Sequence, residues 1–291
     1  MPPKKLAPVV AVLNMKGGVG KTTISGNLFR ELYKMLPDKS RTVLVDFDAQ
    51  FNLTQLLVTS AAYDNLQTQK KTLWHIFEPS AQTNIFQTSD NHRATIDDYR
   101  AFIHPLKRTT EGDELLLVPG DFRISSLNIR ENPQTLEMPR KRFKDFIKKA
   151  REDCALVVLD CNPSSSFLTR TAIEVATHLL VPIRLDKYSV LGLQMLKQYV
   201  DLIPNLGDAP EITVIVNGTR NFMSGVEQEI RAHAQFGPNV MVATIPETRI
   251  LAARHDFTGF GVDRKVPHSK TTRAKLRKAA EELAKKLKLI P

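Results

Sequence analysis

Residues 16 to 23 read Lys-Gly-Gly-Val-Gly-Lys-Thr-Thr, an octet whose residue types suit the binding of a phosphate chain. Its glycines let the backbone curl until several N–H groups point inward at phosphate oxygens. The Lys21 ammonium can reach the β- and γ-phosphates of a nucleotide, and the Thr22 hydroxyl is placed to bind Mg²⁺. The octet therefore predicts a phosphate-binding loop made by Gly17, Gly18, Val19, Gly20, Lys21, Thr22 and Thr23.

The elements on either side of the octet support this reading. An apolar run at 9–13 precedes it, and a helical pattern follows from Thr23 to about Leu36. A strand, a Gly-rich turn and a helix form the context that such a loop needs, and the helix N-terminus adds partial positive charge. The standard Gly-x4-Gly-Lys-Ser/Thr pattern is not met, because Met15 occupies its first position and a second lysine, Lys16, begins the loop.

Aspartates end two further predicted strands. Asp46 and Asp48 lie at the end of the strand predicted at 42–47, and Asp160 ends the strand predicted at 154–160. In an extended chain, residues two apart face the same side, and the carboxyl ends of strands in an open α/β sheet face the ligand crevice. Asp160 is the candidate for holding Mg²⁺, through its water shell. A plain role as a cap or turn former stays open for Asp46 and Asp48.

The octet resembles the deviant Walker A motif of the ParA/MinD family of ATPases. Residues 45–52 resemble the switch I segment of that family, and residues 160–164 resemble its Walker B and switch II segment. The resemblance covers most of the chain and leaves 58–112 poorly anchored. It implies an α/β, three-layer P-loop NTPase fold, with a mostly parallel twisted sheet of about seven or eight strands and helices on both faces.

The resemblance also assigns roles to single residues. Lys16 matches a lysine that crosses a dimer interface and contacts the phosphates bound by the partner subunit. Asp48 matches the aspartate that orients the attacking water, and Asp46 becomes a supporting residue on the magnesium side. Asn217 matches an asparagine that reads the edge of adenine, although a structural role for an asparagine at a strand end remains open, and Pro246 is a further candidate for nucleotide contact.

Two positions depart from the family pattern. Ala49 replaces the proline that usually follows the switch I aspartate, and Asn162 replaces one of two prolines after Walker B. Both changes remove a restriction on backbone φ. We expect them to loosen the backbone and to alter switch kinetics more than nucleotide binding.

Apolar runs alternate with helical patterns along the chain, which indicates a parallel sheet covered by helices. We expect one ParA-like ATPase domain over residues 1–291. Residues 58–112 are polar with few apolar anchors, apart from a short helix near 73–77 whose Trp74 and Phe77 are interpreted as packing residues. Strands are predicted at 8–14, 42–47, 114–118, 154–160, 178–184, 211–217 and 240–245.

The net charge of +10 is unevenly distributed. Residues 262–291 hold ten Lys or Arg against three Asp or Glu, and a second basic cluster spans 140–151. Such a balance favours a polyanionic partner, although a solvated helix face is the preferred interpretation for 140–151 and stays open for the tail. By resemblance and by their place in the basic tail, the candidate DNA contacts are Arg220, Arg249, Arg273 and Arg277.

ParA-like proteins bind DNA without sequence preference, whereas MinD-like proteins bind membrane through a C-terminal amphipathic helix. The apolar stripe of the terminal helix holds Leu and Ala but no Phe or Trp. Interfacial helices favour those aromatics, so we expect the stripe to dock onto the domain. The sequence thus predicts a Mg²⁺-dependent ATP hydrolase of low intrinsic rate. It is expected to form an ATP-dependent homodimer and to bind DNA non-specifically. Its expected role is the partition of plasmids, chromosomes or other cargo. A ParB-like partner would stimulate hydrolysis; the alternative is a MinD-like membrane-associated positioning ATPase.

Other classes fit less well. The chain shows no secretory signal and no apolar run of membrane-spanning length, and Cys154 and Cys161 are expected to be reduced. A cytoplasmic protein, nucleoid-associated when ATP is bound, is therefore expected. Neither cysteine matches a cluster-carrying reductase, and the retained Lys16, Asp48 and Asp160 argue against a non-enzymatic DNA-coating module. No N-terminal helix-turn-helix domain is expected, which disfavours operator-specific binding.

Overall fold

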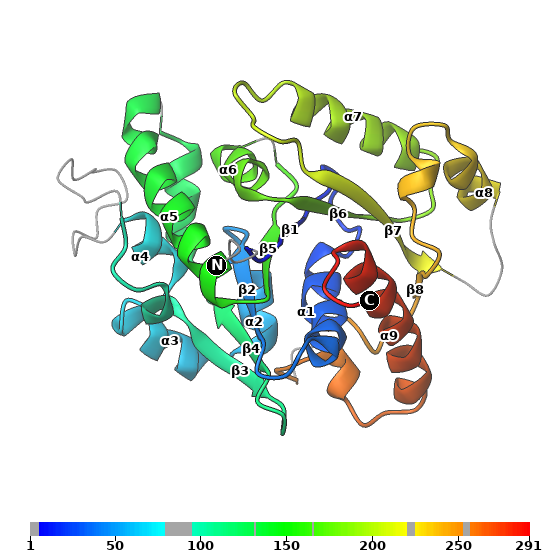
Figure 1. Ribbon diagram of the computed structural model, residues 1–291, viewed down its shortest axis with the longest axis horizontal. Coiled ribbons are helices and arrows are strands. Elements are labelled where there is room, and N and C mark those ends of the chain that lie inside the picture. Colours follow the sequence, from blue (N-terminus) through cyan, green and yellow to red (C-terminus); the bar gives the residue numbers. More distant parts are fainter. Residues whose placement is uncertain (1–5, 79–94, 131, 165, 220–224, 253–256) are drawn as a thin grey trace.

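The computed structural model describes residues 6–78, 95–130, 132–164, 166–219, 225–252 and 257–291. Its centre is a sheet of eight strands (Figure 1). The strands are β1 (Val9–Val12), β2 (Arg41–Phe47), β3 (His104–Arg108), β4 (Glu114–Val118), β5 (Leu156–Cys161), β6 (His178–Ile183), β7 (Glu211–Thr219) and β8 (Ile245–Pro246). Their order across the sheet is β3-β4-β2-β5-β1-β6-β7-β8, and all neighbours pair in parallel except β3 with β4. The predicted α/β fold is confirmed.

Helices cover both faces of the sheet (Figure 1). The α-helices in the described residues are α1 (Lys21–Leu32), α2 (Asn52–Leu57), α3 (Ser60–Thr68), α4 (Leu73–Phe77), α5 (Glu137–Asp153), α6 (Phe167–Val175), α7 (Ser189–Asp201), α8 (Gly225–Ala232) and α9 (Ser269–Lys286). Short 3-10 turns lie at Tyr33–Met35, Tyr99–Phe102, Phe122–Asn128, Pro133–Leu136, Gly237–Asn239 and Gly261–Asp263.

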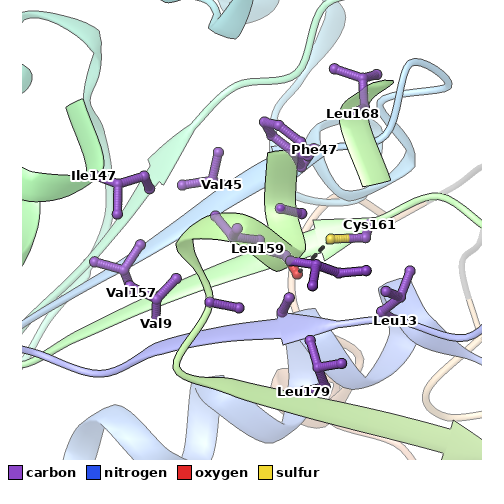
Figure 2. Packing of buried hydrophobic residues seen from close by; sticks show 14 of the residues in the cluster. Val9, Leu13, Val45, Phe47, Ile147, Val157, Leu159, Cys161, Leu168 and Leu179 are labelled. Atoms are coloured by element: carbon purple, nitrogen blue, oxygen red, sulfur yellow. Dashed lines mark hydrogen bonds between the residues drawn. The ribbon is translucent and has the colours of Figure 1, made fainter. Parts of the chain in front are cut away.

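Alternate residues of the central strands supply two hydrophobic cores, one on each face. Val9 and Ala11 of β1 join the core under α4, α5, α6 and α7, whereas Val10 and Val12 join the core under α1, α2 and α9. This alternation is the period-two geometry of a strand buried on both sides. Figure 2 shows the first core, where side chains of β1, β2 and β5 gather around Leu159.

The terminal helix docks as the sequence predicts. α9 lies beside α1 (Figure 1), and its stripe is buried at Leu276, Ala280, Leu283 and Leu287. Below the stripe, Asp263 accepts hydrogen bonds from Arg30 on α1 and from Arg273 on α9. The C-terminal segment is therefore joined to the helix that begins at the phosphate-binding octet.

One prediction about elements was confirmed and one was wrong. The short helix predicted near 73–77 is α4, and its Trp74 and Phe77 pack as predicted, at 4% and 1% exposed. The strand predicted at 240–245 is reduced to β8 and one isolated bridge from Val240.

The sequence also missed β3, the antiparallel edge strand. It contains Pro105, Lys107 and Arg108, and its pairing with β4 shifts register between Pro105 and Lys107. Proline and lysine are typical of edge strands, and they hide the apolar pattern by which the other strands are recognised.

Candidate functional site

The octet forms the turn between β1 and α1. Gly18 and Gly20 have φ of 74° and 93°, in the left-handed region that favours glycine. Asn217, at the end of β7, donates from its side-chain Nδ2 to the Val19 carbonyl at 2.7 Å. A Cβ on Gly20 would lie 2.2 Å from that Nδ2. Asn217 thus braces the loop in this structure, and its contact with adenine stays a prediction, as does that of Pro246 on β8.

Lys21 lies within the loop, where its Nζ donates to the carbonyls of Asn14 and Lys16, each at 3.2 Å. Burial lowers the pKa of Lys21, and the charges of Asp160 and Asp48 oppose that shift. Asn14 also accepts from the Lys16 N–H at 2.9 Å. The sequence analysis missed Asn14, although its position between a strand and the octet was a usable signal.

Asp46 and Asp160 are register partners on the adjacent strands β2 and β5, and both are buried. Asp46 Oδ2 accepts from Thr54 N–H at 2.7 Å and from Thr54 Oγ1 at 2.6 Å. Asp160 Oδ1 accepts from Ser25 Oγ at 2.7 Å. The remaining oxygens, Asp46 Oδ1 and Asp160 Oδ2, have no hydrogen-bond partner within the described residues. Ser25 and Thr54 are site residues that sequence reasoning missed.

The electrostatics of this pair fit a site for a divalent cation. Burial raises the pKa of Asp160 to about 7, against hydrogen bonds from Ser25 and Thr22. Burial, with the Asp160 charge adding to it, raises the pKa of Asp46 well above its usual range. Each of these buried carboxylates has one oxygen without a hydrogen-bond partner in the described residues, and Mg²⁺ prefers such oxygen ligands.

The described residues contain no group of three or more His, Cys, Asp or Glu arranged to hold a metal by itself. Mg²⁺ at nucleotide sites is bound by one or two carboxylates together with substrate phosphates and water, so it does not need such a group. Thr22, Asp160 and Asp46 therefore remain the residues that fit the ion.

Asp48 follows β2 and is 8% exposed. Its Oδ1 accepts from Gln50 N–H at 2.9 Å, and its carbonyl accepts from Phe51 N–H at 2.9 Å. Burial raises the pKa of Asp48, partly offset by the Gln50 hydrogen bond and the Lys21 charge. The turn that contains Ala49 is thus held by two hydrogen bonds, and the effect of losing the proline restriction there stays a prediction.

Asn162, the second departure from the family pattern, is also held by hydrogen bonds. Its side-chain Oδ1 accepts hydrogen bonds from Ser164 and from Thr169 on α6. Hydrogen bonds replace the ring restriction that a proline would give. The effect of either departure on switch kinetics stays a prediction.

Lys16 lies at the outer side of the loop and makes an ion pair with Asp186, just before α7. Its Nζ also lies 5.9 Å from the centre of the Tyr188 ring. The two charged side chains are 40% and 37% exposed, and pairs of such exposure contribute little free energy. Lys16 is therefore held weakly on its own chain. Asp186 and Tyr188 carry no signal in the sequence.

A hollow of about 810 Å³ opens beside Thr22 and Thr23, at the start of α1. Residues of α2 and α3 and the side chain of Leu251 line it. Its volume is within the usual range of small-molecule sites. The phosphate-binding loop therefore lies next to space for a larger ligand.

The four candidate DNA contacts have different surroundings. Arg220 lies outside the described residues. Arg249 is exposed at a hollow of about 490 Å³ that it shares with Arg264. Arg273 pairs with Glu31 at 3.1 Å and with Asp263 at 2.7 Å, so its contacts are structural. Arg277 is exposed and has no ion pair among the residues that the structure describes.

The basic cluster at 140–151 is largely engaged within the fold. Arg142 is buried and donates to the Ile76 carbonyl, while Arg140 and Lys144 face Glu174. Lys149 pairs with Asp145. The predicted solvated helix face is therefore wrong for Arg142, which is buried, and the ion pairs show that Arg140, Lys144 and Lys149 are engaged within the fold.

Comparison with known proteins identifies the family. The family described as "AAA domain" matches residues 7–210. The chain belongs to the ParA/MinD family of P-loop ATPases. It is 27% identical over 281 residues to the chromosome-partitioning ATPase Soj of Thermus thermophilus, covering 95% of both chains. It is 25% identical over 257 residues to the chromosome partitioning protein ParA of Myxococcus xanthus, covering 86% of this chain and 78% of that one.

Several solved structures share the fold of this ParA/MinD-family ATPase. The McdA(D38A)–ATP complex of Cyanothece has a TM-score of 0.68 and 18% identity, and the match covers 99% of this chain and 98% of that one. Cobyrinic acid a,c-diamide synthase of Mycobacterium smegmatis with ADP and magnesium has a TM-score of 0.67 and 19% identity, covering 97% of this chain and 96% of that one. A plasmid partition protein of Borrelia burgdorferi has a TM-score of 0.62 and 16% identity, covering 96% of this chain and 100% of that one. At these identities the likeness concerns the fold. Among the helices described, none is long and apolar enough to span a bilayer.

Proposed function

We propose that this ParA-family ATPase is a partition protein: ATP drives two copies into a sandwich dimer, the dimer binds DNA without sequence preference, and hydrolysis releases it. The observation that carries the proposal is the pair of lysines on one loop. Lys21 is buried among loop carbonyls, whereas Lys16 stays on the outer side in a half-exposed pair. Relatives named as partitioning proteins support the cellular role.

Within one protomer, the loop amides and Lys21 neutralise the phosphates of ATP. Asp48 accepts a hydrogen bond from the attacking water and orients it toward the terminal phosphate. Thr22, Asp160 and Asp46 would hold Mg²⁺, which would supply charge neutralisation for the phosphate oxygens. Ser25 and Thr54 fix the two buried carboxylates so that their free oxygens stay available for that role.

Lys16 supplies the step that needs two copies. In the dimer it leaves Asp186 and contacts the phosphates bound by the partner subunit, so the developing negative charge is stabilised only when both copies are present. A lone protomer lacks this cation. Low intrinsic turnover follows, and a ParB-like partner that favours the productive dimer would raise it.

The DNA surface is assigned to the outer face of the C-terminal segment. Its exposed cations have no ion pair within the described residues: Lys265 before α9, and Lys270, Lys275, Arg277 and Lys278 on α9. Cations of this kind neutralise DNA phosphates and release counterions, which gives binding without sequence preference. Arg249 extends the same basic character toward β8.

The proposal is tested by co-sedimentation of the protein with DNA in ATP, ADP or no nucleotide. We expect retention with ATP alone, and we expect Lys16→Ala to abolish it while ATP binding by one protomer persists. Lys148→Ala on α5, another exposed lysine, is the control and should behave as the unaltered chain. Equal DNA retention with ADP and ATP, or full retention by Lys16→Ala, would contradict the proposal.

The membrane-binding alternative is tested by flotation of anionic vesicles in ATP. The buried stripe of α9 argues against it, because a helix that binds an interface must expose its apolar face. ATP-dependent flotation together with absent DNA binding would replace the DNA role by the membrane role.

A further inference from the structure

Asn162, one of the two departures from the family pattern, is the centre of a small hydrogen-bond network. Its Oδ1 accepts from Ser164 Oγ at 2.8 Å, from Ser164 N–H at 3.4 Å and from Thr169 Oγ1 at 3.3 Å. The Thr169 hydroxyl also donates to the Ser164 carbonyl, so its single proton is shared between two acceptors. The network connects the chain that leaves β5 with the first turn of α6.

The α6 end of this network is fixed in the core. Thr169 is 1% exposed, and its N–H donates to Ser166 Oγ at 3.3 Å, which caps the helix. Leu168 and Ala172 of α6 are fully buried in the core that includes β1 and β5. A segment that is hydrogen-bonded to Thr169 is therefore anchored to this core.

The other end of the network borders the phosphate site. Phe47 of β2 and Cys161 of β5 are the last register partners of the two strands. Asp48 and Asn162 are the next residue of each chain, at the carboxyl edge of the sheet where the octet also lies. The segment 162–164 therefore leaves the sheet from the strand adjacent to that of Asp48, and it is called the wall below, as the border of the space in which Asp48 would meet the attacking water.

We propose that Asn162 is a positioning residue for ATP hydrolysis, which fixes the wall formed by 162–164 through Ser164 and Thr169. This inference rests on the proposed function, because it concerns the turnover of the same site. A proline would fix the wall through its ring. Asn162 fixes it through hydrogen bonds to a buried helix turn, so the order of the wall depends on Thr169 as well.

The test measures kcat, KM and the equilibrium affinity for a fluorescent ATP analogue. Asn162→Ala and Thr169→Val should each lower kcat about two- to tenfold, the effect of removing one hydrogen bond that is expressed in the transition state, with affinity unchanged. The double variant should be no slower than the slower single variant, because both changes break one network. Asn128→Ala, an exposed asparagine distant in sequence, is the control.

Two rescue variants separate positioning from general damage. Asn162→Ser should restore most of kcat, since a serine hydroxyl can accept from the N–H two residues on. Asn162→Pro should do so as well, by restricting φ. A kcat of Asn162→Ala equal to that of the unaltered chain, multiplicative losses in the double variant, or failure of both rescues would overturn the inference. No hydrolysis by the unaltered chain would instead overturn the proposed function, and this inference with it.

Discussion

At the scale of single residues, the site depends on how tightly Asp46 is enclosed. Thr54 donates twice to this carboxylate and accepts from the Gly120 N–H at 2.8 Å. A Cβ on Gly120 would lie 2.6 Å from Phe51 Cβ and 2.9 Å from Asp46 Oδ2. Position 120 therefore needs glycine, because any side chain there would collide with the Asp46 carboxylate and with Phe51.

Gly120→Ala should lower the free energy of unfolding by about 1–3 kcal/mol, because overpacking a filled site forces its neighbours to move. It should also weaken Mg²⁺-dependent ATP binding, since Asp46 is among the residues displaced. Gly207→Ala is the control, because nothing lies within 4 Å of its Cβ. Denaturant unfolding and nucleotide titration measure both effects, and an unchanged stability of Gly120→Ala would contradict the argument.

The sequence predicted the residues that carry a local pattern and missed those defined by the fold. Lys21, Asp48 and Asp160 were found because a Gly-rich loop and strand ends mark them. Ser25 and Asp186 were not found, because serine on a helix and aspartate before a helix are common. Their partners, Asp160 and Lys16, are 135 and 170 residues away along the chain. Only the sheet order brings them together.

At the scale of elements, α4 and its packing residues Trp74 and Phe77 were predicted, but the burial of its histidine was not. The segment around it is rich in polar residues, but one of them, His75, is itself built into the core at 7% exposure. The Thr72 hydroxyl donates to Asp121 at 2.7 Å, so its oxygen accepts from His75 Nδ1–H at 3.1 Å. Burial lowers the pKa of His75 to about 4, and the nearby Arg123 charge adds to this.

This histidine should make α4 sensitive to acid. The pKa of His75 is depressed from 6.5 in the unfolded chain to about 4 in the folded one. The unfolded state therefore binds more protons in this window, and stability is lost as pH falls from 6.5 towards 4. The slope is at most about 1.4 kcal/mol per pH unit.

Urea unfolding followed by fluorescence of Trp74, the single tryptophan, measures this loss. His75→Gln should flatten the pH dependence between pH 6.5 and 4, and His233→Gln, at a histidine outside α4, is the matched control. Parallel pH profiles for the unaltered chain and His75→Gln would show that another group titrates.

At the scale of the whole molecule, α9 has one face that packs on the domain and one exposed face that carries cations. The buried stripe joins the C-terminal segment to α1, and the exposed face carries the cations assigned to DNA. The helix itself was predictable from its periodicity. The structural role of Arg273 was not, because its partners Glu31 and Asp263 are polar residues that only the packing of α9 on α1 brings together.

Removing Lys275, Arg277 and Lys278 together by alanine substitution should weaken DNA binding and reduce the slope of log K against log salt by roughly 0.9 for each DNA phosphate that is no longer neutralised. Stability should stay within about 0.5 kcal/mol, since these are surface positions. Leu283→Ala on the buried face should instead cost about 2–5 kcal/mol. Salt-dependent binding and thermal unfolding separate the two faces, and an unchanged salt slope in the triple variant would relocate the DNA surface.

The two edge strands of the sheet, β3 and β8, affect how copies of the protein can associate. β8 has only two residues, and β3 presents a proline, a register shift and two cations at the opposite margin. Neither margin offers the long, flat row of free N–H and C=O groups on which amyloid-like stacking or strand exchange begins. If the proposed DNA role holds, copies gathered on DNA are not expected to join edge to edge, and a filament would be built from side-chain surfaces and not by lengthening the sheet.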